Sequence, residues 1–272
     1  MQQGHVQYTF HTGEEYLRQI LIAELSAIGF DGFEEKADSL LAFLSAEEND
    51  DAVQAIAEKY RVRADKIFIP EQNWNALWES NFQPVIISDR VAVRAEFHQP
   101  VKNVLHEIII TPKMSFGTGH HATTYMMIEQ MCELDFLNKV VFDFGTGTGL
   151  LAILAEKLGA TNVIAIDNDE RCIENAAENI RQNNCNKIQL VLSDKPAAGY
   201  KCDIALANLN KNIIFENFFS LHEMMQPDAQ LLLSGLLISD EGAILHRANE
   251  VKLRLATRQE REGWILLQLS KK

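Results

Sequence analysis

The spacing of apolar side chains predicts alternating strands and helices over the first 70 residues. Apolar positions recur every second residue in 6–10 and 61–69, and every third or fourth residue in 15–28 and 51–60. Two shorter extended segments lie at about 32–36 and 39–45. Thr12 and Glu15 have the spacing of a capping box, which predicts a helix that Thr12 caps. The order is βαββαβ, so we expect a small ferredoxin-like α+β domain at 1–70.

A short connector follows this first module. It lies between Pro70 and Pro84 and carries two tryptophans, Trp74 and Trp78, four positions apart and therefore on one face of a helix. Such a pair is typical of a linker helix that docks on a neighbouring domain, and contact with a substrate is the alternative. We expect a linker helix at 71–84 and a larger domain at 85–272.

The larger domain has the pattern of an α/β fold. Its apolar runs are continuous, as in strands buried on both faces of a parallel sheet, and helical patterns separate them. The expected strands lie at 140–144, 163–166, 188–192, 203–207 and 230–234. Two extended segments around the Glu262-Gly263 turn, 252–258 and 264–270, predict an antiparallel hairpin. We expect a Rossmann-like, mostly parallel sheet that this hairpin closes.

The composition is that of an ordinary globular protein. Of the 272 residues, 47% are hydrophobic and 23% are charged. No apolar run reaches the roughly 18 residues that cross a bilayer, and the first residues lack the features of a signal peptide. The four cysteines are scattered and form no C-x-x-C pair. We therefore expect a cytoplasmic protein with reduced thiols, no membrane contact and a monomeric state.

The charge balance bears on the partner. The net charge is −13, and residues 1–70 hold thirteen acidic against six basic side chains. No cluster of lysine and arginine tracks a phosphate backbone, so we expect no direct binding to DNA. An acidic surface suits a basic protein partner, whose encounter it would steer. The same surface would also serve only to keep the protein in solution.

The densest chemical signal follows the first buried strand. Gly145, Gly147 and Gly149 stand at alternate positions, and Asp167 ends the next strand. A dinucleotide fingerprint would need a third glycine at Leu150. Glycines let the backbone approach a ligand, and a carboxylate after a strand can accept hydrogen bonds from both ribose hydroxyls. The pattern predicts a nucleoside site, although a tight turn beside a surface acid would look similar.

This spacing, with Asp143 ahead of the glycines, resembles the nucleoside-binding loop of class I S-adenosylmethionine-dependent methyltransferases. Their cofactor is a sulfonium without a pyrophosphate, so no phosphate cradle is needed. A helix predicted from about Ala122 would offer free N–H groups to its methionine carboxylate, and Thr124 a hydroxyl. Asp194, after the third strand, would reach the adenine amino group. The His120-His121 pair lacks partners at metal-ligand spacing, so we expect no metal site.

Four motifs together resemble the PrmA family of bacterial ribosomal protein L11 methyltransferases. They are SFGTGHHATT, DFGTGTGLLAILAEKLGATNVIAIDND, ANLN and LLLSGLL, in the family's order and spacing. The WNALWESNFQPV connector and the first module match as well. The resemblance covers nearly the whole chain. The central glycine loop alone indicates only a methyltransferase, whereas FGTGHHATT and the domain order are specific to the family.

The resemblance implies a function and a set of residues. The chain would transfer methyl groups from S-adenosylmethionine to lysine and N-terminal amines of one basic large-subunit ribosomal protein, L11, up to the trimethylated state. The first module would hold this substrate. Implied cofactor contacts are Thr124, Gly145, Asp167 and Asn208, to which the fold logic adds Gly147 and Asp194. Asn208 would also be catalytic, because its amide can orient the amine or the cofactor.

The sequence departs from the family at two places, and three different functions stay open. Thr146 and Thr148 stand where the family commonly has Cys and Ser, and Asn208-Leu-Asn-Lys211 replaces Asn-Ile-Leu on the acceptor side. The acceptor could be another protein or an RNA, although the chain has no aromatic residue beside Asn208 that would stack on a flipped base. The chain could also be an NAD-linked oxidoreductase, or a non-catalytic binding protein with the same fold.

Overall fold

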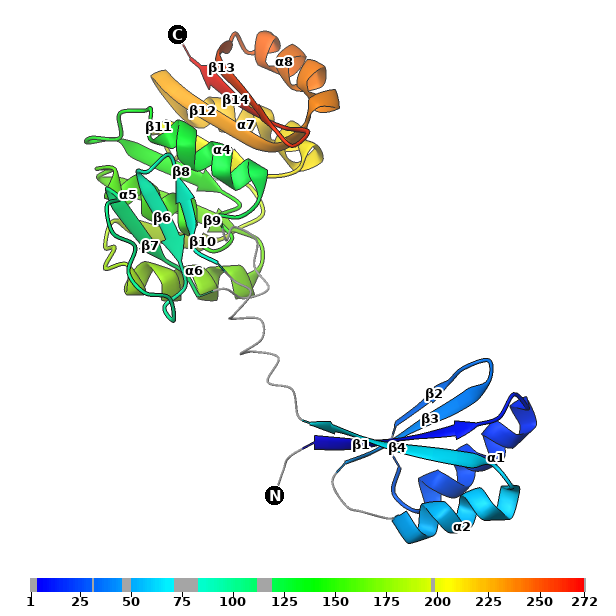
Figure 1. The fold of residues 1–272 in the computed structure, drawn as a ribbon. Helices are drawn as coiled ribbons and strands as arrows, with labels where there is room; N and C mark the ends of the chain where they lie inside the picture. The colour runs from blue at the N-terminus through cyan, green and yellow to red at the C-terminus, as the bar shows by residue number, and fades with distance from the viewer. Residues whose placement is uncertain are drawn as a thin grey trace. The chain divides into compact units, whose positions relative to one another are not determined.

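The computed structural model describes residues 4–30, 32–45, 50–70, 83–111, 119–196 and 199–271. The chain forms two compact units, Met1–Asn81 and Phe82–Lys272, each with its own hydrophobic core (Figure 1). The expected linker helix with its two tryptophans lies outside the described residues.

The smaller unit is a four-stranded antiparallel sheet with two helices on one face (Figure 1). Its elements are β1 (Gly4–His11), α1 (Glu15–Ala27), β2 (Gly32–Glu35), β3 (Ser39–Ser45), α2 (Asp50–Tyr60) and β4 (Arg63–Pro70). The strand order is β2-β3-β1-β4. The alternation in β1 buries Val6, Tyr8 and Phe10 against Leu21 and Leu25 of α1. The βαββαβ prediction is confirmed.

The predicted capping box is wrong. Helix α1 begins at Glu15, and Glu14 is its N-cap without a side-chain hydrogen bond. Thr12 instead accepts a hydrogen bond from the Glu14 N–H at 3.2 Å. The reason lies in the preceding strand, because β1 pairs with both neighbours as far as His11. The chain therefore needs residues 12–14 to turn before the helix starts.

The larger unit contains a seven-stranded sheet in the order β10-β9-β8-β11-β12-β14-β13. All pairs from β10 to β12 are parallel, and β14 runs antiparallel to both of its neighbours. The strands are β8 (Val140–Phe144), β9 (Asn162–Asp167), β10 (Ile188–Leu192), β11 (Cys202–Asn208), β12 (Met225–Leu237), β13 (Arg254–Arg261) and β14 (Trp264–Ser270). This confirms the expected parallel sheet with a closing hairpin.

Helices cover both faces of this sheet, and each face has its own core. On one face lie α4 (Ala122–Met131), α5 (Leu150–Lys157) and α6 (Glu170–Gln182). On the other lie α7 (Lys211–Met224) and α8 (Glu241–Glu250), which the 3-10 helix η1 (Ile238–Asp240) precedes. Side-chain alternation divides each strand between the two cores: Val141 belongs to the first, Phe142 and Phe144 to the second.

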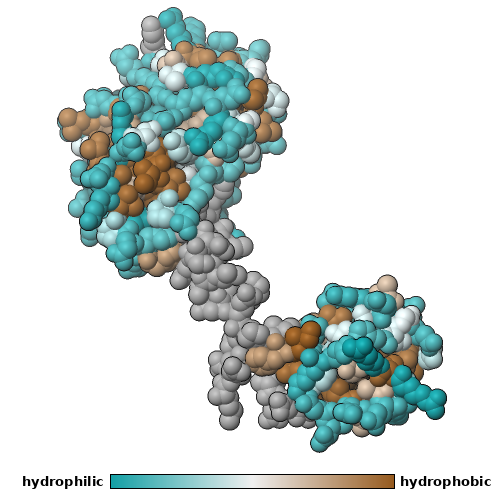
Figure 2. All heavy atoms as spheres, in the orientation of Figure 1, coloured by the Kyte–Doolittle hydropathy of each residue, from teal (hydrophilic) through white to brown (hydrophobic). Residues whose placement is uncertain are grey.

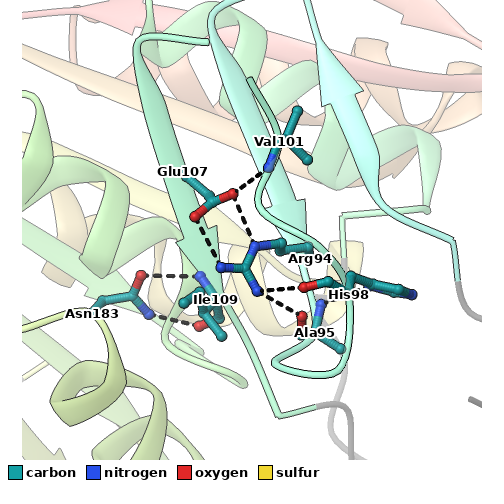
Figure 3. Close-up of polar contacts among 7 residues, drawn as sticks. All are labelled: Arg94, Ala95, His98, Val101, Glu107, Ile109 and Asn183. Carbon is teal, nitrogen blue, oxygen red and sulfur yellow. Dashed lines mark hydrogen bonds and ion pairs between the residues drawn. The ribbon is translucent and has the colours of Figure 1, made fainter. Parts of the chain in front are cut away.

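A separate three-stranded sheet packs into the first of these cores. It has the order β5-β6-β7 and comprises β5 (Val85–Ile87), β6 (Val91–Arg94) and β7 (His106–Ile109). An ion pair joins β6 to β7: Arg94 donates to the Glu107 carboxylate at 3.0 Å and to the carbonyls of Ala95 and His98 at 3.1 Å (Figure 3). The guanidinium holds the pKa of Glu107 below its usual value.

Most of the visible surface is hydrophilic, with a few apolar areas (Figure 2). Within the described residues, no helix has the length and apolar character needed to cross a membrane.

Candidate active site

A cavity of about 330 Å³ opens where β8, β9 and β11 end. Parallel strands present their carboxyl ends at one edge of a sheet, which is where ligands bind in open α/β folds. The lining residues are His121, Thr123, Thr124, Gly145, Thr146, Gly147, Thr148, Leu150, Leu151, Asp167, Cys172, Asn208, Leu209, Asn210, Gly235 and Trp264.

The glycine loop between β8 and α5 is fixed to the end of β9. The N–H groups of Gly145 and Thr146 both donate to the Ile166 carbonyl at 2.9 Å. The φ angles of Gly145 and Gly147 are 75° and 55°, in the left-handed region that favours glycine. The loop therefore keeps a tight backbone conformation at the edge of the cavity.

Asp167 holds the loop from the end of β9. Its Oδ2 accepts from the Gly147 N–H at 2.9 Å, and its Oδ1 accepts from the Asp169 N–H at 3.1 Å. The residue is 9% exposed and lines the cavity. Each carboxylate oxygen has two lone pairs, so both oxygens can still accept a hydrogen bond from a ligand hydroxyl.

Asp143, the acid before the glycines, lies beneath the loop. Thr146 Oγ1 donates to its Oδ2 at 2.6 Å, and within the described residues its Oδ1 has no hydrogen-bond partner. Burial raises the pKa of Asp143 to about 7, and the charge of Asp167 acts in the same direction. The fold thus favours the protonated form of a carboxyl group next to the cavity.

Asn208 and Thr124, which both line the cavity, contact each other. The Asn208 amide, at the end of β11, donates to Thr124 Oγ1 on α4 at 3.2 Å. Its Oδ1 is buried and has no partner among the described residues. An unpaired buried acceptor is costly, so this atom is suited to a donor that a ligand brings.

His121 caps the helix that carries Thr124. Its Nδ1 accepts from the Thr123 N–H at 3.3 Å, which fixes the first turn of α4, and its ring lies edge-on to Trp264 at 4.9 Å between centroids. His120 instead contacts the Gln83 carbonyl at 2.9 Å. In the described part of the chain, no three His, Cys, Asp or Glu residues are grouped as metal ligands would be.

Leu209 is wedged between two glycines. A Cβ on Gly145 would lie 2.5 Å from Leu209 Cδ2, and one on Gly235 would lie 2.4 Å from the Leu209 carbonyl oxygen. The loops after β8 and β11 and the end of β12 are therefore packed closely together. Neighbouring Lys211 forms an ion pair with Asp240 at 2.9 Å, which joins the start of α7 to η1.

The structure brings together five of the six predicted site residues: Thr124, Gly145, Gly147, Asp167 and Asn208 all line the cavity. Asp194 is exposed in the loop after β10 and is not among the lining residues.

Sequence analysis did not identify several further lining residues as part of the site. Thr146 and Thr148 could have been found because they alternate with the glycines. Leu209, Asn210 and Gly235 lie in the quoted motifs ANLN and LLLSGLL but were not named as site residues. Cys172 and Trp264 have no local signal, because tertiary packing brings them to the cavity.

Comparison with known proteins gives a consistent result. Residues 11–272 match the family described as "Ribosomal protein L11 methyltransferase (PrmA)". A protein of that name from Bacteroides fragilis is 34% identical over 271 residues, which cover 96% of this chain and 97% of that protein. Another from Chlorobaculum parvum is 39% identical over 254 residues, covering 88% and 86%.

A solved structure is similar as well. The crystal structure titled ribosomal protein L11 methylase, from Lactobacillus delbrueckii subsp. bulgaricus, superimposes with a TM-score of 0.66 at 27% identity. The match covers 70% of this chain and 100% of that one.

Proposed function

Since the chain belongs to the PrmA family of ribosomal protein L11 methyltransferases, we propose that it is an enzyme that methylates amines of ribosomal protein L11. The methyl donor is S-adenosylmethionine, and the acceptors are lysine and N-terminal amines, up to the trimethylated state. The observation that carries the proposal is Asn208, which lines the same cavity as Asp167 and the glycine loop and whose buried Oδ1 has no hydrogen-bond partner among the described residues.

The residues around the cavity fit S-adenosylmethionine. Asp167 has acceptor capacity left for the ribose hydroxyls, and the loop at Gly145 and Gly147 lets a ligand approach the backbone. Thr124 lies in the first turn of α4, where N–H groups and the helix dipole favour a carboxylate. When bound, S-adenosylmethionine supplies an electrophilic methyl group on sulfur.

On the acceptor side, the chain has to orient a neutral amine. Asn208 Oδ1 can accept a hydrogen bond from an amine N–H, which points the nitrogen lone pair away from the amide. Leu209 and Trp264 give this side an apolar border. Loss of water lowers the pKa of an amine, so more of it is in the reactive neutral form. Orientation and desolvation are the contributions that we assign to these residues.

We assign substrate recognition to the smaller unit. It is a separately packed ferredoxin-like domain, and none of its described residues lines the cavity of the larger unit. Its share of the acidic excess suits a basic ribosomal protein, whose approach it would steer.

The test uses purified, unmethylated L11, S-adenosylmethionine and intact-mass spectrometry. We expect mass gains in steps of one methylene, and their number gives the methylation state. Asn208→Ala should lower kcat by about a hundredfold or more if the amide orients the acceptor. Glu223→Gln, on the surface of α7, should leave the rate unchanged.

Two outcomes would contradict this proposal. Binding of S-adenosylhomocysteine without methylation of L11 would direct the search to another protein or to RNA. Absence of any binding would exclude the methyltransferase activity itself.

A further inference from the structure

Helix α6 and its C-cap carry three buried asparagines at four-residue spacing: Asn175, Asn179 and Asn183. This spacing places them on one face of the helix. Their exposed fractions are 0%, 0% and 8%. Asparagine is a weak helix former, and burying an amide is costly unless it is hydrogen-bonded. The hydrogen-bond partners of these amides should therefore explain why asparagine is present at the three buried positions.

Two of the asparagines bind the backbone of β7 and the residues that follow it. Asn183 accepts from the Ile109 N–H at 3.0 Å and donates to the Ile109 carbonyl at 2.6 Å, as a neighbouring strand would (Figure 3). Asn183 also donates to the Asn179 carbonyl at 2.8 Å within the helix. Asn175 donates to the Thr111 carbonyl at 3.2 Å. The hydrogen bonds of Asn183 and Asn175 therefore cover the backbone along the β7 edge of the small sheet.

Asn179 differs from the other two asparagines because it binds the glycine loop as well as the backbone after β7. Its Oδ1 accepts from the Thr111 N–H at 2.7 Å, and its Nδ2 donates to the Thr148 carbonyl at 2.8 Å. Thr148 belongs to the glycine loop and lines the cavity. Asn179 thus joins the loop to the backbone after β7, whereas the amide groups of Asn175 and Asn183 donate to the backbone at Thr111 and Ile109.

Two side chains from different elements bind adjacent residues of the glycine loop. Asp167 accepts from the N–H of Gly147, and Asn179 donates to the carbonyl of Thr148. At the following residue α6 packs directly against the loop, because a Cβ on Gly149 would lie 3.1 Å from Ala176 Cβ. The loop conformation therefore depends on α6 as well as on the end of β9.

We propose that Asn179 is a positioning residue for the cofactor. It fixes the Thr148 carbonyl, holds the glycine loop in its binding conformation, and couples the loop to the edge of the small sheet at Thr111. It acts through the loop and makes no contact with the ligand. The identity of the ligand rests on the proposed function; the coupling does not.

The test compares Asn179→Asp with Asn183→Asp. Each change keeps the shape of the side chain, removes one buried amide donor from the same helix face, and leaves a carboxylate facing a carbonyl. Both variants should lose thermal stability. Only Asn179→Asp should weaken S-adenosylhomocysteine binding, by about tenfold, as expected for one buried hydrogen bond, and Asn183→Asp by less than about twofold. Calorimetric titration well below both unfolding transitions gives the Kd values.

Hydrogen exchange in the ligand-free protein gives a second readout. Peptides that cover residues 144–150 should exchange faster in Asn179→Asp and at the wild-type rate in Asn183→Asp. This result does not depend on methyl transfer. Wild-type protein that fails to bind S-adenosylhomocysteine would therefore contradict the proposed function, whereas the exchange rates would still decide the coupling.

Two results would overturn the inference. One is wild-type exchange and affinity in Asn179→Asp. The other is an equal loss in both variants, which would mean that the asparagines only support the helix. If an aspartate variant does not fold, Asn179→Leu and Asn183→Leu make the same comparison without added charge.

Discussion

Asp143 is a carboxyl group that the fold buries completely beside a second acid, Asp167. Its pKa of about 7 lies above the ordinary 3.8, so the folded state binds the proton more tightly than the unfolded state. The contribution of Asp143 to stability is therefore full below about pH 4 and is lost as the pH rises to about 7.

Replacing this acid by its uncharged isostere should stabilise the ligand-free protein. At pH 8 we expect Asp143→Asn to raise the free energy of unfolding by a few kcal/mol, at about 1.4 kcal/mol per pKa unit. Near pH 4 the difference should disappear. Urea denaturation across this pH range measures it. Asp169→Asn is the control, because Arg171 lowers the pKa of Asp169, whose side chain is 35% exposed, and removal of that charge should not stabilise. Equal stability of Asp143→Asn and wild type at pH 8 would contradict the expectation.

The two glycines around Leu209 predict different consequences for added methyl groups. In Gly145→Ala the new Cβ meets the end of the Leu209 side chain, whereas in Gly235→Ala it meets the Leu209 backbone. Each change should cost about 1–3 kcal/mol or more, because both sites are tightly packed and have positive φ. Leu209→Ala should restore part of the stability of Gly145→Ala and none of that of Gly235→Ala. A double-mutant cycle with urea denaturation measures this, and equal rescue of both would exclude the proposed contacts.

Residues with a local signal could be predicted from the sequence. Gly145 and Gly147 follow a buried strand at fixed spacing, and Asp167 and Asn208 end strands, so their common edge follows from the fold. Trp264 could not be predicted, because the pairing of β14 with β12 brings it to the cavity. The predicted adenine contact of Asp194 stays a prediction, since its side chain is exposed after β10.

At the scale of elements, the small sheet depends on a buried ion pair. The Arg94 side chain is only 8% exposed, and it neutralises Glu107 while satisfying two carbonyls (Figure 3). Removal of Arg94 leaves the Glu107 carboxylate and two carbonyls without their donor. An uncompensated buried charge typically costs about 3–5 kcal/mol, and we expect about 3 kcal/mol here because the Glu107 side chain is 26% exposed.

Arg94→Met should therefore lower the Tm of the larger unit by about 6–12 °C, from a loss of about 3 kcal/mol at about 2–4 °C per kcal/mol. Arg90→Met is the matched control, because Arg90 pairs with Glu133 and their side chains are 42% and 56% exposed; such surface pairs contribute at most about 1 kcal/mol. Scanning calorimetry of the full chain compares the two. Equal Tm shifts in the two variants would mean that the Arg94–Glu107 pair contributes no more to stability than a surface pair.

Periodicity predicted which elements form better than how they pair. The parallel strands were found because burial on both faces gives continuous apolar runs. The separate sheet of β5, β6 and β7 was not predicted, because the pairing of β6 with β7 is a tertiary event. Strand β12 begins at Met225 rather than Gln230, since it continues directly from α7 without a turn that sequence could reveal.

At the scale of the molecule, all of the described residues that line the cavity belong to the larger unit. A chain of residues 83–272 should bind S-adenosylhomocysteine with a Kd within about threefold of the full chain. It should methylate L11 about a hundredfold more slowly or worse, because the effective concentration that a recognition domain provides is lost. Binding and intact-mass assays measure the two effects. Full activity of the shortened chain would remove the smaller unit from substrate recognition.

The sequence predicted that the chain has two units, because the βαββαβ pattern ends where the connector begins. The connector itself, including Trp74 and Trp78, lies outside the described residues. The expected boundaries at 70 and 84 stay predictions beside the compact units Met1–Asn81 and Phe82–Lys272.

The placement of the described lining residues in the larger unit has a consequence for protein engineering. A domain that binds a different protein, fused ahead of residue 83, would deliver new lysines to an unchanged catalytic module. The larger unit would then methylate proteins chosen by the attached binding domain. The length of the joining segment would determine which lysines of the bound protein come within the distance of the catalytic site.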